Sequence, residues 1–383
     1  MKIAVFTETY HPQVNGVVVF LSDILPLLSK KARIVLFAPG GNRLKMENIN
    51  RNFKIYWVPA LPFPLYEGYR MSTILPKELK KILKEEKPDV VHLHAPVLMG
   101  LNAMRVSRKL GLPVVATYHT HFPDYIPHLF MGHLPKSLAE LAKSPVKKMI
   151  AYVFSKADCT TAPTAELRKE LEGYGVRNVL HVPNGVRFDK FGKSNATGFL
   201  KKYKIPEDKP VVLYVGRVSF EKKLEVLLNA FKKIRNATLV IVGSGPSLKD
   251  YKKLAKSLEL ENVVFTEYVG ASSLPDAYAA ADIFASPSDS ETFGLTFVEA
   301  MYFGLPVIGV NRLGAKEVIR NKSNGFLVKP DDADGFAEKI TLLLEKPELR
   351  KKLGAQGKKD SKKYDMERVA EKFLKLYGKL AKS

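Results

Sequence analysis

The chain has 383 residues, a length that suggests two or three domains. It has only one cysteine, Cys159, so a disulfide within the chain is excluded and a cysteine-based metal site is not expected. No apolar run approaches the ~18 to 20 residues of a membrane-spanning helix, and Met1 leads directly into a strand-like segment. We therefore expect a cytoplasmic protein without a secretory signal.

The charge is strongly basic, with 61 Lys+Arg against 39 Asp+Glu and a formal net charge of +22. Such a balance favours phosphorylated substrates, an anionic membrane surface or nucleic acid as partners. The excess is mostly lysine spread along helical segments, without arginines clustered among aromatic residues, so we expect no nucleic-acid partner. Attraction to a membrane surface and a thermophile-like composition both remain as explanations of the charge.

The N-terminal half alternates apolar runs with helical patterns. Strands are expected at Lys2–Phe6, Ile34–Ala38, Lys54–Val58, Val90–Leu93, Val114–Tyr118 and Cys159–Ala162, with helices at Pro76–Glu86 and Met99–Leu110 among others. This alternation predicts a parallel sheet covered by helices, which binds ligands beyond the carboxyl ends of its strands. Gly16, His92, His94, His119 and His121 follow or end such strands.

The segment Leu134–Phe154 has a helical pattern with one apolar side and several lysines elsewhere. The apolar side comprises Leu138, Leu141, Val146, Met149, Ile150 and Val153, and the lysines are Lys136, Lys143, Lys147 and Lys148. An apolar stripe beside lysines is typical of a helix at a membrane interface, and an ordinary core-facing helix has the same pattern. Pro145 interrupts the pattern and can split it into two helices.

The second half opens after a polar stretch that we interpret as an interdomain linker, residues 193–210. A buried strand then leads into a loop bracketed by Arg217 and Lys222, and a helix follows. Basic side chains at such a loop suit a phosphate-bearing ligand. A later strand ends near Tyr268 and Val269.

The segment Ser286–Gly309 carries two glutamates eight positions apart, Glu291 and Glu299. We expect a loop that ends near Gly294 and a helix that starts directly after it. The unpaired amides at a helix N-terminus suit a phosphate, and carboxylates on either side can accept hydrogen bonds from sugar hydroxyls. The pattern indicates a nucleotide-sugar site.

Four strings carry a resemblance to a known family: NGV from Asn15, TYHTHF from Thr117, GRVSFEK from Gly216, and ETFGLTFVEAMYFGLPVI from Glu291. In this order and spacing, they resemble glycosyltransferase family 4, whose members are retaining enzymes of the GT-B fold. The resemblance implies an α/β fold of two doubly wound Rossmann-like domains that face a central cleft. It implies an acceptor-side domain at 1–192 joined by the last helix, 366–380, and a nucleotide-sugar domain at 211–363.

The resemblance also implies residue roles. The catalytic group would be His119, Arg217, Lys222 and Glu291, and the donor would contact Gly16, Arg217, Lys222, Tyr268, Val269, Glu291, Phe293, Gly294, Leu295, Thr296 and Glu299. In this scheme Arg217, Lys222 and the amides after Gly294 stabilise the leaving diphosphate, so neither a metal nor another cofactor is expected. Three positions depart from the family pattern: Asn15 and Lys223 replace a usual glycine, and Arg187 replaces a usual Asp.

The acceptor is suggested by two segments, Pro62–Ser72 and His119–Phe130. They resemble the branch that glycosylates glycerolipids, which includes glucosyl-, mannosyl- and sulfoquinovosyl-diacylglycerol synthases. We therefore expect transfer of a hexose from a UDP- or GDP-sugar, with retention, to a glycerolipid hydroxyl, by a protein peripheral to the inner face of the cell membrane. The alternatives are a soluble sugar or sugar-phosphate acceptor, a non-catalytic nucleotide-sugar-binding protein, and a nucleic-acid-binding protein.

Overall fold

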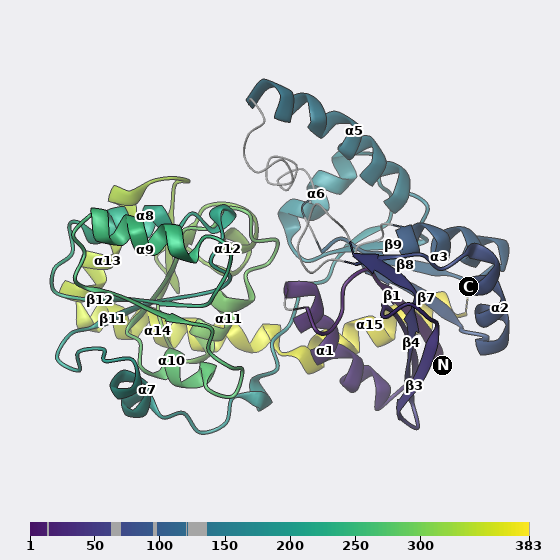
Figure 1. Ribbon diagram of the computed structural model, residues 1–383, viewed down its shortest axis with the longest axis horizontal. Coiled ribbons are helices and arrows are strands. Elements are labelled where there is room, and N and C mark those ends of the chain that lie inside the picture. The colour runs from purple at the N-terminus through teal and green to yellow at the C-terminus, as the bar shows by residue number, and fades with distance from the viewer. Residues whose placement is uncertain (14, 63–69, 95–97, 120, 122–135, 383) are drawn as a thin grey trace. The chain divides into compact units, whose positions relative to one another are not determined.

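The computed structural model describes residues 1–13, 15–62, 70–94, 98–119, 121 and 136–382, with no side-chain description for 136–143. The chain forms two compact units (Figure 1). The first comprises Met1–Gly185 together with Met366–Ser383, and the second comprises Val186–Asp365.

The first unit is built on an eight-stranded sheet of order β10-β9-β8-β7-β1-β2-β4-β3. Its strands are β1 (Lys2–Thr7), β2 (Arg33–Pro39), β3 (Lys45–Asn50), β4 (Phe53–Val58), β7 (Val90–His94), β8 (Val114–Thr117), β9 (Cys159–Ala162) and β10 (Val179–His181). All neighbours are parallel except β3, which pairs antiparallel with β4. A separate pair joins β5 (Ala60–Pro62) and β6 (Arg70–Ser72). From β1 the chain first adds strands on the side of β2 and later adds β7 and its successors on the other side of β1. The strand order therefore reverses between β1 and β7, and doubly wound sheets bind ligands at such a point.

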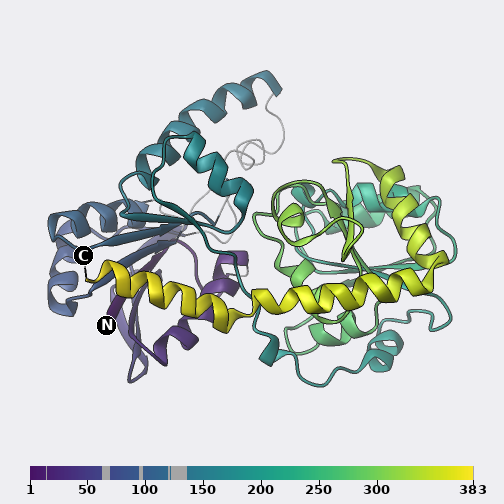
Figure 2. The same cartoon turned by 180° about the vertical axis from the view of Figure 1, so that it is seen from behind.

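The helices of the first unit come from both ends of the chain. They are α1 (Gly16–Ser29), α2 (Pro76–Glu86), α3 (Leu98–Lys109), α5 (Lys136–Phe154), α6 (Ala165–Gly173) and α15 (Met366–Leu380). Figures 1 and 2 show α15 beside α1, and Phe373 and Tyr377 of α15 share one buried core with Phe20 of α1 and Val5 of β1. The last helix therefore completes the core of the unit that the first strand begins.

Helix α5 runs unbroken from Lys136 to Phe154 with Pro145 inside it, so it is not split as the sequence allowed. On its C-terminal half Ile150 and Val153 are buried, whereas Met149 and Tyr152 are exposed. The core-facing interpretation thus accounts for two of the stripe residues. Side chains of 136–143, which include the rest of the stripe except Val146, lie outside the description. None of the helices described is long and apolar enough to cross a bilayer.

The second unit is built on a six-stranded parallel sheet of order β13-β12-β11-β14-β15-β16. Its strands are β11 (Val211–Val215), β12 (Thr238–Val242), β13 (Val263–Glu267), β14 (Ile283–Ser286), β15 (Val307–Val310) and β16 (Gly325–Val328). Alternate residues of β11 point to opposite faces, so Val212 and Tyr214 join one core while Leu213 joins the other. The prediction of parallel α/β units with helices on both faces is confirmed.

Helices cover both faces of this sheet. They are α7 (Ala196–Lys202), α8 (Leu224–Phe231), α9 (Leu248–Ser257), α10 (Leu274–Ala279), α11 (Leu295–Tyr302), α12 (Leu313–Val318), α13 (Ala333–Glu345) and α14 (Pro347–Ser361). Residues 193–210, expected as a linker, contain α7 and lie within the second unit, because Phe199 and Ile205 are buried in one of its cores. These two apolar side chains attach an otherwise polar stretch to the core of the second unit.

Candidate functional site

The loop with Arg217 and Lys222 leaves the carboxyl end of β11 in the second unit. Its backbone is bonded to the glycine-rich turn after β12: the amide of Gly216 donates to the carbonyl of Val242 at 3.0 Å, and that of Val218 donates to Ser244 at 3.0 Å. A Cβ on Gly243, where φ is +141°, would lie 1.8 Å from the carbonyl oxygen of Gly216. The glycine-rich turn therefore supports the basic loop through close backbone contact.

Lys222 meets Glu291 across 69 positions of sequence. Its ammonium nitrogen lies 2.7 Å from Glu291 Oε1, and the two side chains are 14% and 29% exposed. Lys222 ends the short helix η2 (Phe220–Lys222), and Glu291 lies in the loop between β14 and α11. The structure thus brings together two of the four side chains predicted to be catalytic.

Lys223, which stands where the family usually has glycine, is in the left-handed region with φ of +53°. Its ammonium group lies 2.6 Å from Asp289 and 2.9 Å from Asp331. Burial alone would lower the pKa of Lys223, but the hydrogen bonds to Asp289 and Asp331 outweigh it and raise that pKa. Because Asp289 lies in the same loop as Glu291, Lys223 ties the basic loop to the acidic one.

Gly294 forms the junction between the Glu291 loop and α11. Its φ is +76°, and a Cβ there would lie 2.7 Å from the ring of Phe297. The helix begins at Leu295, which confirms the predicted start. Phe293, however, is 1% exposed and packs in the core, so its ring is not available to a ligand, while Leu295 and Thr296 are half-buried.

Glu299, one helical turn further along α11, accepts a hydrogen bond from the hydroxyl of Tyr278 on α10 at 2.5 Å. Burial, together with the neighbouring Glu299 charge, raises the pKa of Tyr278, so its hydroxyl stays a donor at neutral pH. Sequence reasoning missed Tyr278, since no local signal links α10 to the Glu299 turn. At the end of β13, Tyr268 is exposed and Val269 is buried.

In the first unit, Gly16 is the first residue of α1. The preceding Asn15 caps the helix: its side-chain oxygen accepts from the amides of Val17 and Val18 at 3.0 and 3.1 Å. Asn15 in place of the usual glycine therefore has a structural role. A Cβ on Gly16 would meet no described atom within 4 Å, so packing within the described chain does not require glycine there.

His119 lies two residues beyond β8 and is 5% exposed. Its Nε2 lies 2.7 Å from Nδ1 of His94, the last residue of β7. Burial lowers the pKa of His119 to about 3, so the imidazole is neutral at physiological pH. His121 is also buried, with Nε2 2.9 Å from Glu170 of α6. The interpretation that His121 orders its own surroundings accounts for this contact.

Two protein-family models together match most of the chain. The model of "Glycosyltransferase Family 4" matches residues 14–190, and that of "Glycosyl transferases group 1" matches residues 197–360. The alpha-monoglucosyldiacylglycerol synthase of Streptococcus pneumoniae is 30% identical over 340 residues, which cover 85% of this chain and 75% of that protein. The chain belongs to glycosyltransferase family 4.

Two further comparisons concern this glycosyltransferase. The sulfoquinovosyl transferase SQD2 of Arabidopsis thaliana is 32% identical over 315 residues, which are 80% of this chain and 59% of that protein's length. The crystal structure of the Anabaena protein HepE in complex with UDP matches with a TM-score of 0.79 and 18% identity, and the match covers 99% of this chain and all of that one. The predicted GT-B fold is confirmed.

The predicted site residues of this glycosyltransferase are divided between its units. Arg217, Lys222, Tyr268, Val269, Glu291, Phe293, Gly294, Leu295, Thr296 and Glu299 lie in the second unit, and Gly16 and His119 lie in the first. Their roles stay predictions. Within the part of the chain that the structure describes, no group of three His, Cys, Asp or Glu side chains is arranged to hold a metal ion.

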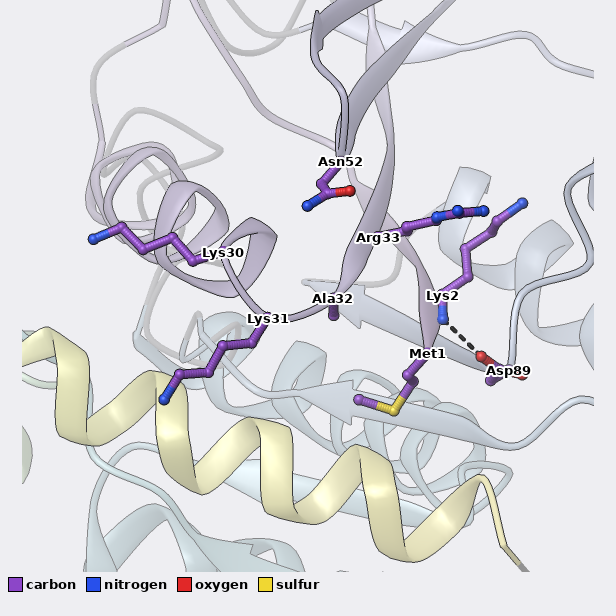
Figure 3. A pocket seen from close by; sticks show the side chains of 8 residues that line it. All are labelled: Met1, Lys2, Lys30, Lys31, Ala32, Arg33, Asn52 and Asp89. Atoms are coloured by element: carbon purple, nitrogen blue, oxygen red, sulfur yellow. Dashed lines mark hydrogen bonds between the residues drawn. The ribbon is translucent and has the colours of Figure 1, made fainter.

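A hollow of about 440 Å³ lies elsewhere in the first unit of this glycosyltransferase (Figure 3). It is lined by Met1, Lys2, Lys30, Lys31, Ala32, Arg33, Asn52 and Asp89. Lys2 and Arg33 begin β1 and β2, so the hollow is at the amino ends of the parallel strands, opposite the carboxyl ends near His94 and His119. Lys30 and Lys31 follow α1, where the helix dipole favours cations, so a solvated basic face explains them.

Proposed function

We propose that this glycosyltransferase transfers a hexose from a nucleotide sugar to a glycerolipid hydroxyl with retention of anomeric configuration. The observation that carries the proposal is the Lys222 to Glu291 contact beside the start of α11. A cation, a carboxylate and the first amides of a helix, all within one unit, suit the diphosphate and the sugar of one donor.

The donor would be held by groups of the second unit. Arg217 and Lys222 would contact the diphosphate together with the first amides of α11, and Glu299 would accept hydroxyl hydrogens of the ribose. Glu291 would bind the transferred sugar. Two opposite charges about 4 Å apart are worth roughly 4 kcal/mol in partly buried surroundings against about 1 in water, so shielding from solvent strengthens this clamp.

The reaction would proceed on one face of the sugar. The acceptor oxygen forms a bond to the anomeric carbon as the bond from that carbon to the diphosphate oxygen breaks. The acceptor proton passes to the leaving diphosphate, whose negative charge Arg217 and Lys222 stabilise. No metal is needed in this scheme, since both cations belong to the protein. Activity is therefore expected to persist in EDTA.

The acceptor class rests on similarity. The pneumococcal relative is named for monoglucosyldiacylglycerol synthesis and the Arabidopsis relative for sulfoquinovosyl transfer, while the HepE structure holds UDP. A lipid acceptor would place the enzyme at a membrane surface, at least transiently. The exposed Met149 and Tyr152 of α5, with the exposed Lys147 and Lys148 beside them, suit such a surface.

The test incubates pure enzyme with radiolabelled UDP-glucose or GDP-mannose and vesicles that contain diacylglycerol, with Glu291→Ala as the control. We expect label in the organic phase with one donor, and an α-linked product by NMR. Label confined to an aqueous product would establish a soluble acceptor instead of a lipid. Absence of transfer from either donor to lipid, sugar or sugar phosphate would refute the transferase proposal.

A further inference from the structure

Three histidines gather at the carboxyl ends of two neighbouring strands in the first unit. His92 and His94 belong to β7, and the register of the sheet pairs His94 with Thr117, the last residue of β8. His119 follows two positions later, which places it beside His94. The three side chains are 1%, 3% and 5% exposed.

His94 and His119 are in direct contact. Nδ1 of His94 lies 2.7 Å from Nε2 of His119, and the two rings are 5.0 Å apart at an angle of 21°. The ring of Phe20 flanks both, 5.1 Å from His119 and 6.0 Å from His94. The contact is therefore a buried hydrogen bond with an apolar side chain against it.

Both imidazoles are neutral at physiological pH. Burial lowers the pKa of His119 to about 3, and burial with the charges of the neighbouring histidines lowers the pKa of His94 well below its usual value. Each neutral ring has one N–H and one bare nitrogen. Only one hydrogen can lie between the facing nitrogens, so the tautomer of His94 determines that of His119.

His92 holds His94 in place without competing for this hydrogen. Its ring lies 3.9 Å from that of His94. Its own nitrogens have other partners: Nδ1 lies 2.6 Å from the hydroxyl of Tyr377, and Nε2 lies 2.7 Å from that of Thr117. Burial raises the pKa of Tyr377, so its hydroxyl keeps its hydrogen at neutral pH, and hydroxyl groups engage both nitrogens of His92 in either tautomer of that ring.

We propose that His94 is a positioning residue: it donates its Nδ1 hydrogen to Nε2 of His119 and thereby fixes the hydrogen of His119 on Nδ1. In this tautomer His119 presents an N–H donor for a substrate hydroxyl, and only this last step rests on the proposed function. The opposite tautomer would leave Nδ1 of His119 as an acceptor.

The decisive measurement is the tautomer of His119 in ¹⁵N-histidine-labelled full-length protein, read from two-bond nitrogen–proton correlations, with His119→Asn to assign the signals. The matched pair is His94→Asn and His94→Asp. The two side chains have nearly the same shape, but asparagine can donate to His119, whereas an ionised aspartate only accepts. We expect Nε2 of His119 to be bare in the wild type and in His94→Asn, and protonated in His94→Asp.

A protonated Nε2 in the wild type, or a bare one in His94→Asp, would overturn the proposal. If His94→Asp does not fold, the wild type still decides the proposal, since a mixed tautomer of His119 there contradicts a fixed donor. Turnover provides the second measurement. We expect kcat of His94→Asp to fall at least tenfold with KM for the donor changed less than threefold, and His94→Asn to stay within threefold of wild type in both.

The outcomes separate this inference from the proposed function. Normal turnover in a folded His94→Asp variant would reject the role of His94 while the transferase stands. A wild-type protein without transferase activity would reject the function, and the NMR measurement would still establish whether His94 sets the tautomer of His119.

Discussion

Lys223 occupies a backbone conformation that is costly for any residue with a Cβ. Left-handed φ and ψ cost roughly 1 to 2 kcal/mol outside glycine. The side chain offsets part of this cost through its contacts with Asp289 and Asp331, of which only Asp331 is largely exposed. Lysine in place of the family's usual glycine therefore strains the backbone but links two loops through its side chain.

This exchange predicts different effects for two substitutions of Lys223. Lys223→Gly loses both ion pairs but relieves the backbone, so we expect the free energy of unfolding to change by less than about 1 kcal/mol. Lys223→Ala loses the pairs and keeps the strain, so we expect a loss of about 1 kcal/mol. Urea unfolding of both variants would check the order. A glycine variant less stable than the alanine variant would contradict the strain argument, because both variants lose the same two ion pairs.

The Lys222 and Glu291 side chains carry a second prediction at this scale. If they contact diphosphate and sugar as proposed, Glu291→Ala and Lys222→Ala each lower kcat by two or more orders of magnitude, roughly 3 kcal/mol or more. Steady-state kinetics with the active donor measures this loss. Lys249→Ala, at an exposed lysine of the same unit, is the control and should match wild type. Near-normal turnover in either site variant would remove that side chain from the mechanism.

At the scale of elements, the junction of the Glu291 loop with α11 depends on one glycine. Gly294→Ala would put a Cβ at φ of +76° and 2.7 Å from the Phe297 ring. We expect the free energy of unfolding to decrease by about 1 to 2 kcal/mol, and KM for the donor to rise as the first amides of α11 shift. Gly270→Ala in the same unit, with open space around its Cβ, should change neither quantity. Equal stability of the two variants would contradict this account.

The sequence predicted most strands because buried strands of a parallel sheet are continuous apolar runs. It missed β3, whose six residues KMENIN are all exposed, so no burial pattern marks them. It also misread the stretch around α7, where two buried side chains lie within polar surroundings. The start of α11 was predictable, since the glycine and the apolar helical pattern that follows it are both local signals in the sequence.

Contacts between elements were beyond sequence reasoning. The bond from Tyr278 to Glu299 depends on how α10 and α11 pack on one face of the sheet. The bond from His94 to His119 depends on the register of β7 against β8, and a one-residue shift of one strand would place the two histidines on opposite faces of the sheet. Residue types and spacing identify candidate site residues, but which of them contact each other depends on the register of the strands and the packing of the helices.

At the scale of the molecule, both ends of the chain stabilise the first unit. The N-terminal β1 and the C-terminal α15 share one core, and Tyr377 of α15 bonds the buried His92. This unit also contains the only tryptophan of the chain, Trp57 on β4. Tryptophan fluorescence therefore follows the unfolding of the first unit alone.

The buried histidines give that unit a defined dependence on pH. Burial lowers the folded-state pKa of His119 to about 3, and those of His92 and His94 are lowered as well, whereas unfolded histidine titrates near 6.5. As the pH decreases through about 6.5, the unfolded chain binds protons that the folded chain does not, so stability falls; well above that pH these groups no longer affect it. The limiting slope from His119 alone is about 1.4 kcal/mol per pH unit.

Urea unfolding followed by Trp57 fluorescence between pH 5.0 and 7.5 would measure this dependence. Carboxylates with lowered pKa, such as Glu86, contribute mainly near and below their unfolded value of 4.5, so this window reports chiefly on the histidines. We expect a plateau above about pH 7 and a steady loss below it. In His119→Asn the free energy of unfolding should fall less steeply as the pH decreases. The difference in slope should correspond to nearly one proton, because one buried neutral histidine is gone. An identical slope in that variant would mean that His119 takes up its proton in the folded state as readily as in the unfolded chain.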